Sequence, residues 1–296
     1  MKYITTSDKK TGEEIRIAYS DYGQGKPVIL LHGWPLSREM WEYQLEDIVN
    51  AGLRVIKYDR RGFGKSSKPW TGYDYDSLTD DLRAIIERLN LYDVTLVGFS
   101  MGGGEVARYF SNYGGDRIAK VVLISSVTPY LLKTEDNPEG IDSSVFDSLL
   151  EKMRKDRIGF LDDFGKSFFG VNMVSHPVSG PLLEYYRMLG SLASARSTEQ
   201  CTISFSHTDF REDIKKIDVP ALIIHGDADK IVPVEVSSDL TAKMIPGCQY
   251  FIYNDAPHGL FYTHRERLNR DLVSFITSEQ QPVYSDVQEA GNNSIP

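Results

Sequence analysis

The chain has 296 residues, of which 41% are hydrophobic and 25% charged, and its formal net charge is −9. This composition predicts one large globular domain, or one domain with an insertion, and the negative charge argues against nucleic-acid binding. No apolar run is long enough to span a membrane, so we expect no membrane contact. The amino terminus lacks the apolar segment of a signal peptide, and the isolated Cys201 and Cys248 predict buried free thiols, so we expect a cytoplasmic protein.

The first part of the chain alternates predicted strands with predicted helices. Residues 2–7 and 14–19 have the alternating pattern of an edge hairpin. Further strands are predicted at residues 27–31, 54–58, 94–99 and 118–125, and helices at 41–51, 77–90 and 101–112. Strands that alternate with helices indicate a mostly parallel α/β sheet flanked by helices.

The alternation stops after residue 127 and resumes near residue 217. The segment between contains helical pieces rich in aromatic residues and no buried strand. Strands are then predicted at 220–224 and 249–253, and helices at 233–244 and 265–277. We therefore expect an α/β core at 1–127 and 217–279, a helical cap at 128–216, and a polar tail at 280–296 that is mobile or docked on a neighbour.

The stretch from residue 94 to 104 is the most informative part of the chain. An apolar strand runs into Gly98-Phe99-Ser100-Met101-Gly102 and then into a predicted helix. This is the sequence form of a nucleophile elbow, a strained strand-to-helix turn that exposes a serine oxygen. Gly98 and Gly102 remove Cβ atoms that would clash with the turn. The alternative is an ordinary tight turn rich in small residues.

A serine nucleophile needs a base and a group that orients the base. His258, in a Pro-His-Gly loop after a predicted strand, is the candidate base. Asp227 and Asp229 follow another predicted strand and compete for the orienting role. We favour Asp229, which lies farther along its loop, because Asp227 is better placed to close the turn through backbone hydrogen bonds. The order Ser, Asp, His is that of α/β-hydrolases.

An acyl-transfer site also needs donors for the developing oxyanion. The N–H after the nucleophile, that of Met101, is one expected donor. The second is expected from the loop after residues 27–31, where Pro35 has no N–H and Trp34 is therefore the donor.

Other motifs receive structural interpretations. His32 and His225 each precede a glycine at a strand end and are expected to brace their loops. The segment 59–67 is similar to phosphate-binding loops, but Asp59 stands where such a loop needs glycine, so we expect a structural loop with bracing Asp and Arg side chains. No spacing of metal ligands occurs, and no metal or cofactor is expected.

With these residues in place, the chain resembles the α/β-hydrolase superfamily, and most of all the cofactor-free (non-haem) chloroperoxidases, also called perhydrolases, and their aryl esterase relatives. The matching segments are His32-Gly33-Trp34-Pro35-Leu36, Asp59 to Ser66, Gly98 to Tyr109, Leu132-Lys133-Thr134, Asp218-Val219-Pro220, His225 to Asp229 and Ala256 to Leu260.

The resemblance implies a triad of Ser100, Asp229 and His258 with Trp34 and Met101 as oxyanion donors. Members hydrolyse small esters through an acyl-enzyme. With a carboxylic acid and peroxide they release a peracid, which oxidises halide in solution without a metal or other cofactor. The expected partners are therefore a small ester, or a carboxylic acid plus peroxide.

Two other functions stay open. A lactonase or amidase would use the same triad, and a non-catalytic signalling or scaffold protein could share the fold. The complete triad argues against the second, and Ser100 argues against the aspartate-nucleophile dehalogenases and epoxide hydrolases of this fold. The natural substrate and any assembly into homo-oligomers are left open.

Overall fold

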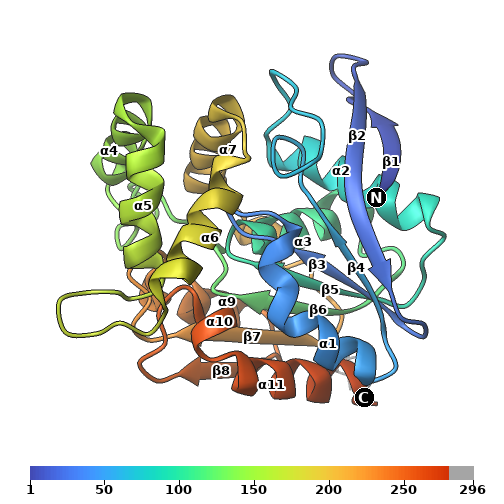
Figure 1. Ribbon diagram of the computed structural model, residues 1–296. Coiled ribbons are helices and arrows are strands. Elements are labelled where there is room, and N and C mark those ends of the chain that lie inside the picture. Colours follow the sequence, from blue (N-terminus) through green and yellow to red (C-terminus); the bar gives the residue numbers. More distant parts are fainter. Residues whose placement is uncertain (280–296) are drawn as a thin grey trace, which may run out of the picture.

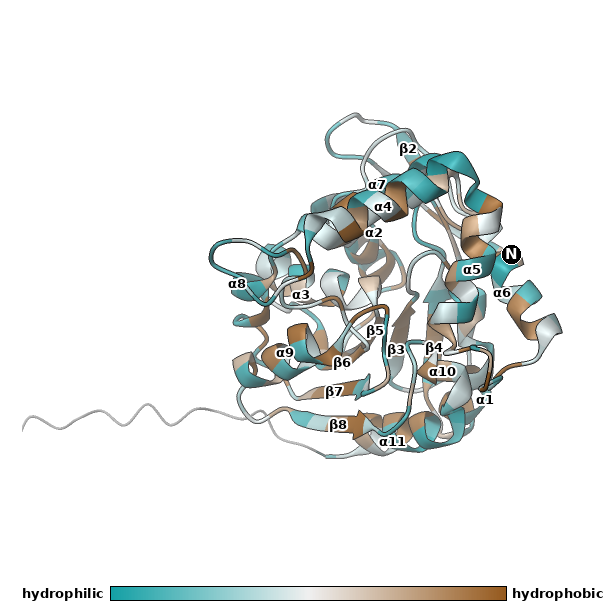
Figure 2. Cartoon of the chain, turned by 90° about the vertical axis from the view of Figure 1, so that its left-hand side faces the viewer, coloured by the Kyte–Doolittle hydropathy of each residue, from teal (hydrophilic) through white to brown (hydrophobic). Residues whose placement is uncertain are grey.

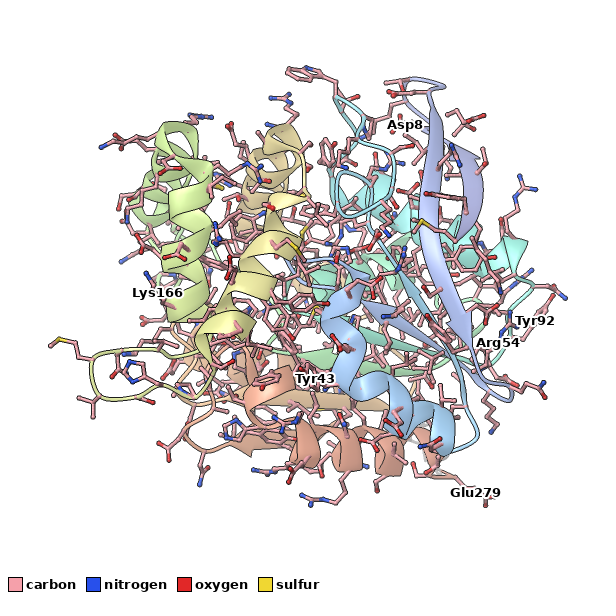
Figure 3. All side chains as sticks on the ribbon, viewed as in Figure 1. Asp8, Tyr43, Arg54, Tyr92, Lys166 and Glu279 are labelled. Carbon is pink, nitrogen blue, oxygen red and sulfur yellow. The ribbon has the colours of Figure 1, made fainter. Side chains whose placement is uncertain are left out.

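The computed structural model describes residues 1–279, and the predicted tail at 280–296 lies outside the described residues. Glu279, the last of them, lies at the edge of the molecule away from Lys166 (Figure 3). The strands are β1 (Lys2–Ser7), β2 (Glu14–Tyr22), β3 (Pro27–Leu31), β4 (Arg54–Tyr58), β5 (Val94–Phe99), β6 (Ile118–Ile124), β7 (Ala221–Gly226) and β8 (Gln249–Tyr253).

These strands form an eight-stranded sheet in the order β1-β2-β4-β3-β5-β6-β7-β8 (Figure 1). The β1–β2 and β2–β4 pairs are antiparallel, and the pairs from β4–β3 to β7–β8 are parallel. The mostly parallel α/β sheet and its edge hairpin, both predicted from the sequence, are confirmed.

Helices cover both faces of the sheet. Helices α1 (Glu42–Asn50) and α11 (Arg265–Thr277) pack on one face, and α2 (Tyr75–Arg88) and α3 (Met101–Tyr113) on the other. Figure 2 shows the hydrophobic residues gathered on the strands between these layers. Within β5, Leu96 packs with one layer and Val97 with the other. Burial on both faces explains why the central strands read as continuous apolar runs.

Five helices lie between β6 and β7 along the chain, and we call the first four of them the helical insertion. They are α4 (Ser143–Lys155), α5 (Arg157–Phe168), α6 (Gly180–Ser191) and α7 (Ala195–His207), followed by the short α8 (Arg211–Ile214). Each of the four begins after a residue whose side chain accepts a backbone N–H of the first turn: Asp142, Asp156, Ser179 and Ser194. Figure 1 shows them grouped together above one end of the sheet. The division of the chain into core, cap and tail stays a prediction.

The structure differs from the sequence prediction at two helices. The helix predicted at 233–244 is divided into a 3-10 turn at Val234–Val236 and α9 (Ser238–Met244), because Ser237 has φ −130° and ψ −96°. The helix predicted at 41–51 begins as a 3-10 turn at Arg38–Trp41 before α1. A further short helix, α10 (Leu260–Thr263), was not distinguished in the sequence.

Two details concern the surface and the thiols. Cys201 is buried, whereas Cys248 is only half-buried, and both are free thiols. Among residues 1–279, no helix combines the length and the apolar character needed to cross a bilayer.

Candidate active site

Ser100 occupies a strained turn between β5 and α3. Its φ of 54° and ψ of −118° lie in a region that residues with a side chain rarely adopt. Its own N–H donates to the carbonyl of Ile124 on the neighbouring strand at 2.8 Å. A Cβ at Gly98 would come within 2.6 Å of the carbonyl oxygen of Gly102, so the turn requires glycine there. This is the backbone geometry of a nucleophile elbow.

Three predicted residues meet at the carboxyl ends of the strands. Ser100 follows β5, Asp229 follows β7 and His258 follows β8, and the carboxyl ends of these parallel strands share one edge of the sheet. The Oγ of Ser100 lies 3.0 Å from Nε2 of His258, and Nδ1 of His258 lies 2.6 Å from Oδ2 of Asp229. All three side chains are buried, so their hydrogen bonds face little competition from water.

The Asp229 carboxylate is held by several donors. Its Oδ1 accepts the backbone N–H groups of Ile231 and Val232, each at 2.9 Å. Burial by itself raises the pKa of Asp229, but His258 and His225 more than offset this and hold the pKa well below its ordinary value. An ionised Asp229 accepts the Nδ1–H of His258, which leaves Nε2 to accept the proton of the Ser100 hydroxyl.

Asp227 has a different role in the same loop. Its side chain is exposed, and Oδ1 accepts the backbone N–H of Asp255 at 2.7 Å. Since Asp255 lies in the loop after β8, Asp227 ties together the two loops that bear Asp229 and His258. The structure therefore pairs His258 with the aspartate that the sequence favoured.

The two expected oxyanion donors belong to residues next to the nucleophile. Met101 begins α3 directly after Ser100. The loop of Trp34 passes against the nucleophile, because a Cβ at Gly33 would lie 3.2 Å from Cβ of Ser100. The indole Nε1–H of Trp34 donates to the carbonyl of Thr198 in α7 at 3.0 Å. Among the backbone–backbone hydrogen bonds of residues 1–279 outside the helices and strands, none is donated by Trp34 or Met101. Their role as oxyanion donors stays a prediction.

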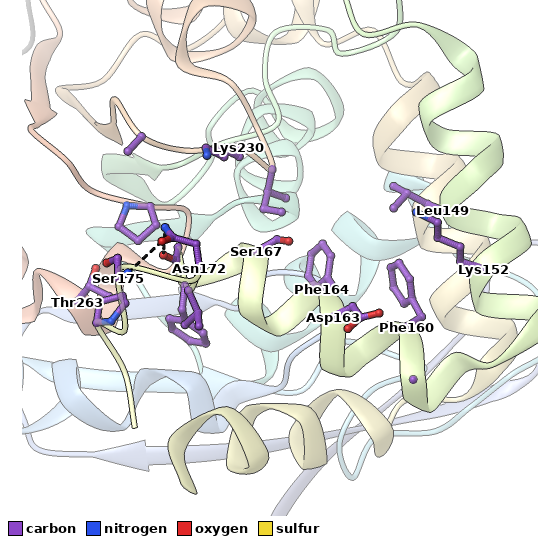
Figure 4. Close-up of a pocket in the computed structure, with 18 of the residues that line it drawn as sticks. Leu149, Lys152, Phe160, Asp163, Phe164, Ser167, Asn172, Ser175, Lys230 and Thr263 are labelled. Carbon is purple, nitrogen blue, oxygen red and sulfur yellow. Dashed lines mark hydrogen bonds between the residues drawn. The ribbon is translucent and has the colours of Figure 1, made fainter. Parts of the chain in front are cut away.

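A groove of about 970 Å³ opens beside the triad loops, between the helical insertion and the loops after β7 and β8. Figure 4 shows Phe160 and Phe164 next to each other on α5, with Leu149 and Lys230 on other sides of the space. The rings of Phe160 and Phe164 lie 6.1 and 5.1 Å from the indole of Trp34. Lys230 directly follows Asp229 in the chain. The groove thus lies next to residues that contact Trp34 or flank Asp229 and His258 in the chain, although the triad side chains do not line it.

Several contacts of the site escaped the sequence interpretation. His225 braces its loop as expected, through Ser238 Oγ at 2.7 Å and the carbonyl of Val232 at 2.9 Å, but its Nε2 also lies 3.2 Å from Oδ2 of Asp229. The position of His225 four residues before Asp229 was the only sequence feature that could have indicated this contact. The ring of Phe168 packs edge-on against His258 at 4.8 Å, which no local pattern indicates.

The loop at 59–67 has the bracing role that the sequence predicted. Asp59 accepts the backbone N–H groups of Arg38 and Lys65, each at 2.9 Å. As for metals, the described part of the chain contains no cluster of three His, Cys, Asp or Glu side chains that could hold an ion.

Known proteins share this architecture and much of the sequence. A family model described as the alpha/beta hydrolase fold matches residues 26–265. A bifunctional esterase/perhydrolase from Acinetobacter calcoaceticus is 40% identical over 281 residues, which cover 94% of this chain and 100% of that protein. The crystal structure of a bromoperoxidase from Bacillus anthracis matches with a TM-score of 0.89 and 48% identity, over 94% of this chain and 100% of that one. An esterase from Exiguobacterium antarcticum matches with a TM-score of 0.86 and 34% identity, over 93% and 99%.

Proposed function

Because the chain belongs to the family of the alpha/beta hydrolase fold, we propose that it is a serine esterase whose acyl-enzyme also reacts with peroxide. The family resemblance read from the sequence is confirmed. The observation that carries the proposal is the continuous line of hydrogen bonds from Ser100 through His258 to Asp229. The relatives include an esterase/perhydrolase and a bromoperoxidase, which supports both the esterase activity and the reaction with peroxide.

The first half-reaction forms the acyl-enzyme. Ser100 Oγ attacks the carbonyl carbon of the ester while its proton passes to Nε2 of His258. The carbonyl oxygen becomes an oxyanion, which the N–H groups of Trp34 and Met101 bind. When the tetrahedral intermediate collapses, the C–O bond to the alcohol breaks and His258 returns the proton to the leaving oxygen. The ionised Asp229 stabilises the imidazolium that exists between these two steps.

The second half-reaction releases the acyl group. Water loses a proton to His258 and attacks the acyl carbon, which frees the carboxylic acid and Ser100. Hydrogen peroxide attacks in the same way, and the product is then the peracid. In solution the peracid oxidises halide to hypohalous acid and reverts to the carboxylic acid, so the overall haloperoxidase activity needs no halide site.

The size and lining of the groove support the proposal that the protein binds small organic substrates. Its lining combines the aromatic rings of Phe160 and Phe164 with the polar loops around Asp229 and His258. A lactonase using the same triad is the second candidate, because a groove of about 970 Å³ has room for a cyclic ester as well as a linear one. The cytoplasmic location stays a prediction from the sequence.

The test is a substrate screen with the purified full-length chain. We expect hydrolysis of p-nitrophenyl esters of short acids, and bromination of monochlorodimedone in acetate buffer with bromide and hydrogen peroxide. Lactones are measured in parallel, and Ser100→Ala is the control for every reaction. Ester hydrolysis that persists in the folded Ser100→Ala variant contradicts the proposed mechanism. Ester hydrolysis without bromination above the Ser100→Ala background would mean that the protein is an esterase without perhydrolase activity.

A further inference from the structure

The Trp34 N–H, the second expected oxyanion donor, belongs to a peptide group whose carbonyl oxygen accepts hydrogen bonds from other parts of the protein. The carbonyl of Gly33 and the N–H of Trp34 are two ends of one planar peptide unit and point in opposite directions. Any contact that fixes the direction of the Gly33 oxygen therefore also fixes the direction of the Trp34 N–H. A hydrogen bond to that oxygen further polarises the peptide and makes its N–H a stronger donor.

The Gly33 oxygen is in fact held by two donors. Nδ1 of His32 lies 2.9 Å from it, and the backbone N–H of Leu36 donates to it at 3.0 Å. On the other side of the imidazole, Nε2 of His32 lies 3.0 Å from the backbone N–H of Arg60. A backbone N–H can only donate, so Nε2 is the acceptor and Nδ1 carries the proton. His32 therefore donates to Gly33.

The imidazole is kept neutral, as this arrangement requires. Burial, together with the charge of Arg60, holds the pKa of His32 well below its ordinary value. Nη1 of Arg60 lies 3.4 Å from Nδ1, too long for a useful hydrogen bond and facing a protonated nitrogen. The ring of Phe63 packs edge-on against the imidazole at 5.6 Å and closes the remaining side.

A buried ion pair ties His32 to the helix that bears the other donor. Nη2 of Arg60 donates to the carbonyl oxygen of His32 at 2.6 Å, and Nε of Arg60 donates to Oε1 of Glu105 at 2.6 Å. Tyr58 donates to the other oxygen of Glu105 at 2.9 Å. Glu105 is in α3, whose first residue is Met101. One buried hydrogen-bond network thus spans from the Trp34 side of the oxyanion hole to the Met101 side.

We propose that His32 is a positioning residue for the oxyanion hole, which orients and polarises the Trp34 N–H through its hydrogen bond to Gly33. This inference rests on the proposed function, because it assigns His32 a part in stabilising the tetrahedral intermediate. His32 does not touch the substrate, so it acts on the reaction only through the Gly33–Trp34 peptide.

Two substitutions separate the two nitrogens of the ring. The amide nitrogen of asparagine is as many bonds from Cβ as Nδ1, so His32→Asn can keep the donor to Gly33. The amide of glutamine is as many bonds from Cβ as Nε2, so His32→Gln can keep the contact with Arg60 but loses the donor to Gly33. A purely structural role for His32 would make the two variants similar, or would make the asparagine variant the worse one.

The kinetic test compares kcat, KM and inhibition by a trifluoromethyl ketone, which forms an oxyanionic adduct with the nucleophile. Loss of one complete oxyanion donor costs about 10²- to 10³-fold in kcat, so for His32→Gln we expect a loss of roughly 10- to 100-fold with KM little changed. The ketone should bind more weakly by the same factor. His32→Asn should stay within about threefold of the wild type. Equal losses in the two variants, or a loss carried by KM, would overturn the inference.

A measurement on the wild type covers the case in which a variant does not fold. In nitrogen-15 spectra of the histidine-labelled protein, His32 should be neutral with its proton on Nδ1 even at pH 6.5, the ordinary pKa of a histidine. A proton on Nε2 would overturn the inference. Failure of the proposed function would appear separately, as a wild type with no more esterase activity than Ser100→Ala.

Discussion

The two sides of the candidate site are built from different interactions. On the side of the sheet, the reacting groups are held by directional hydrogen bonds, such as the 2.6 Å contact between His258 and Asp229. On the side of the helical insertion, Phe160 and Phe164 contact the Trp34 indole only through their rings, at 6.1 and 5.1 Å. Hydrogen bonds fix atoms in place, whereas ring contacts tolerate changes of shape. From this comparison we propose that the sheet side determines the reaction and that the insertion side selects the substrate.

The strongest test of this division is removal of the nucleophile. Ser100→Ala should lower kcat for ester hydrolysis by roughly 10⁵-fold or more, because no acyl-enzyme can form. The fold should survive, since alanine differs from serine only by the absent Oγ. Steady-state rates and circular dichroism measure the two effects. A folded variant with a tenth of the wild-type activity would show that another group is the nucleophile.

The next test separates two aspartates of the same loop. Asp229→Asn should lower kcat by roughly 10³- to 10⁴-fold, because asparagine no longer stabilises the imidazolium and favours the wrong tautomer of His258. Asp227→Asn is the matched control, since it weakens the contact with the Asp255 N–H and should act mainly on stability. Rates and thermal melting are measured for both. An inactive but stable Asp227→Asn variant would mean that Asp227, and not Asp229, orients His258.

A smaller effect is expected on the insertion side. Phe164→Ala enlarges the groove next to Trp34, so kcat/KM for longer acyl chains should rise by roughly tenfold relative to acetate esters. Phe205→Ala is the matched control, because the Phe205 ring also lies against Trp34, at 5.7 Å, but does not line the groove. A p-nitrophenyl ester series with both variants checks this. The same change of preference in both would show that Trp34 packing, and not groove space, sets chain length.

The smallest effect concerns stability in acid. The pKa of Asp229 is lower in the folded state than its ordinary value of 3.8, so the carboxylate adds stability above about pH 4. That contribution starts to be lost as the pH falls below about 4, where the unfolded state takes up the proton, and the loss is complete only below the folded-state pKa. The Tm of the wild type should therefore fall relative to Asp229→Asn between pH 6 and pH 3, by a few degrees. Ser100→Ala keeps the carboxylate, and its Tm should remain parallel to that of the wild type. If the Tm difference between the wild type and Asp229→Asn stays constant from pH 6 to pH 3, the lowered pKa of Asp229 is contradicted.

Much of the fold and the candidate site could be predicted from the sequence. The strands of the sheet are continuous apolar runs because both faces are buried, and such runs are visible without any partner. The elbow around Ser100 was visible because its backbone requires glycines at fixed spacing. His258, and the pair Asp227 and Asp229 as candidates for its partner, were indicated because each follows a strand in a loop rich in glycine or proline. These signals are local, so the sequence determined them by itself.

The tertiary structure decided the contacts between residues far apart in the chain. Arg60 and Glu105 are 45 residues apart, and no local pattern indicates that they form a buried pair behind the oxyanion loop. The choice between Asp227 and Asp229 also depended on how the loops after β7 and β8 lie beside each other in the parallel sheet. The groove is likewise formed by segments from both the insertion and the core. Such contacts arise from the pairing of distant elements, which the periodicity of a single segment does not encode.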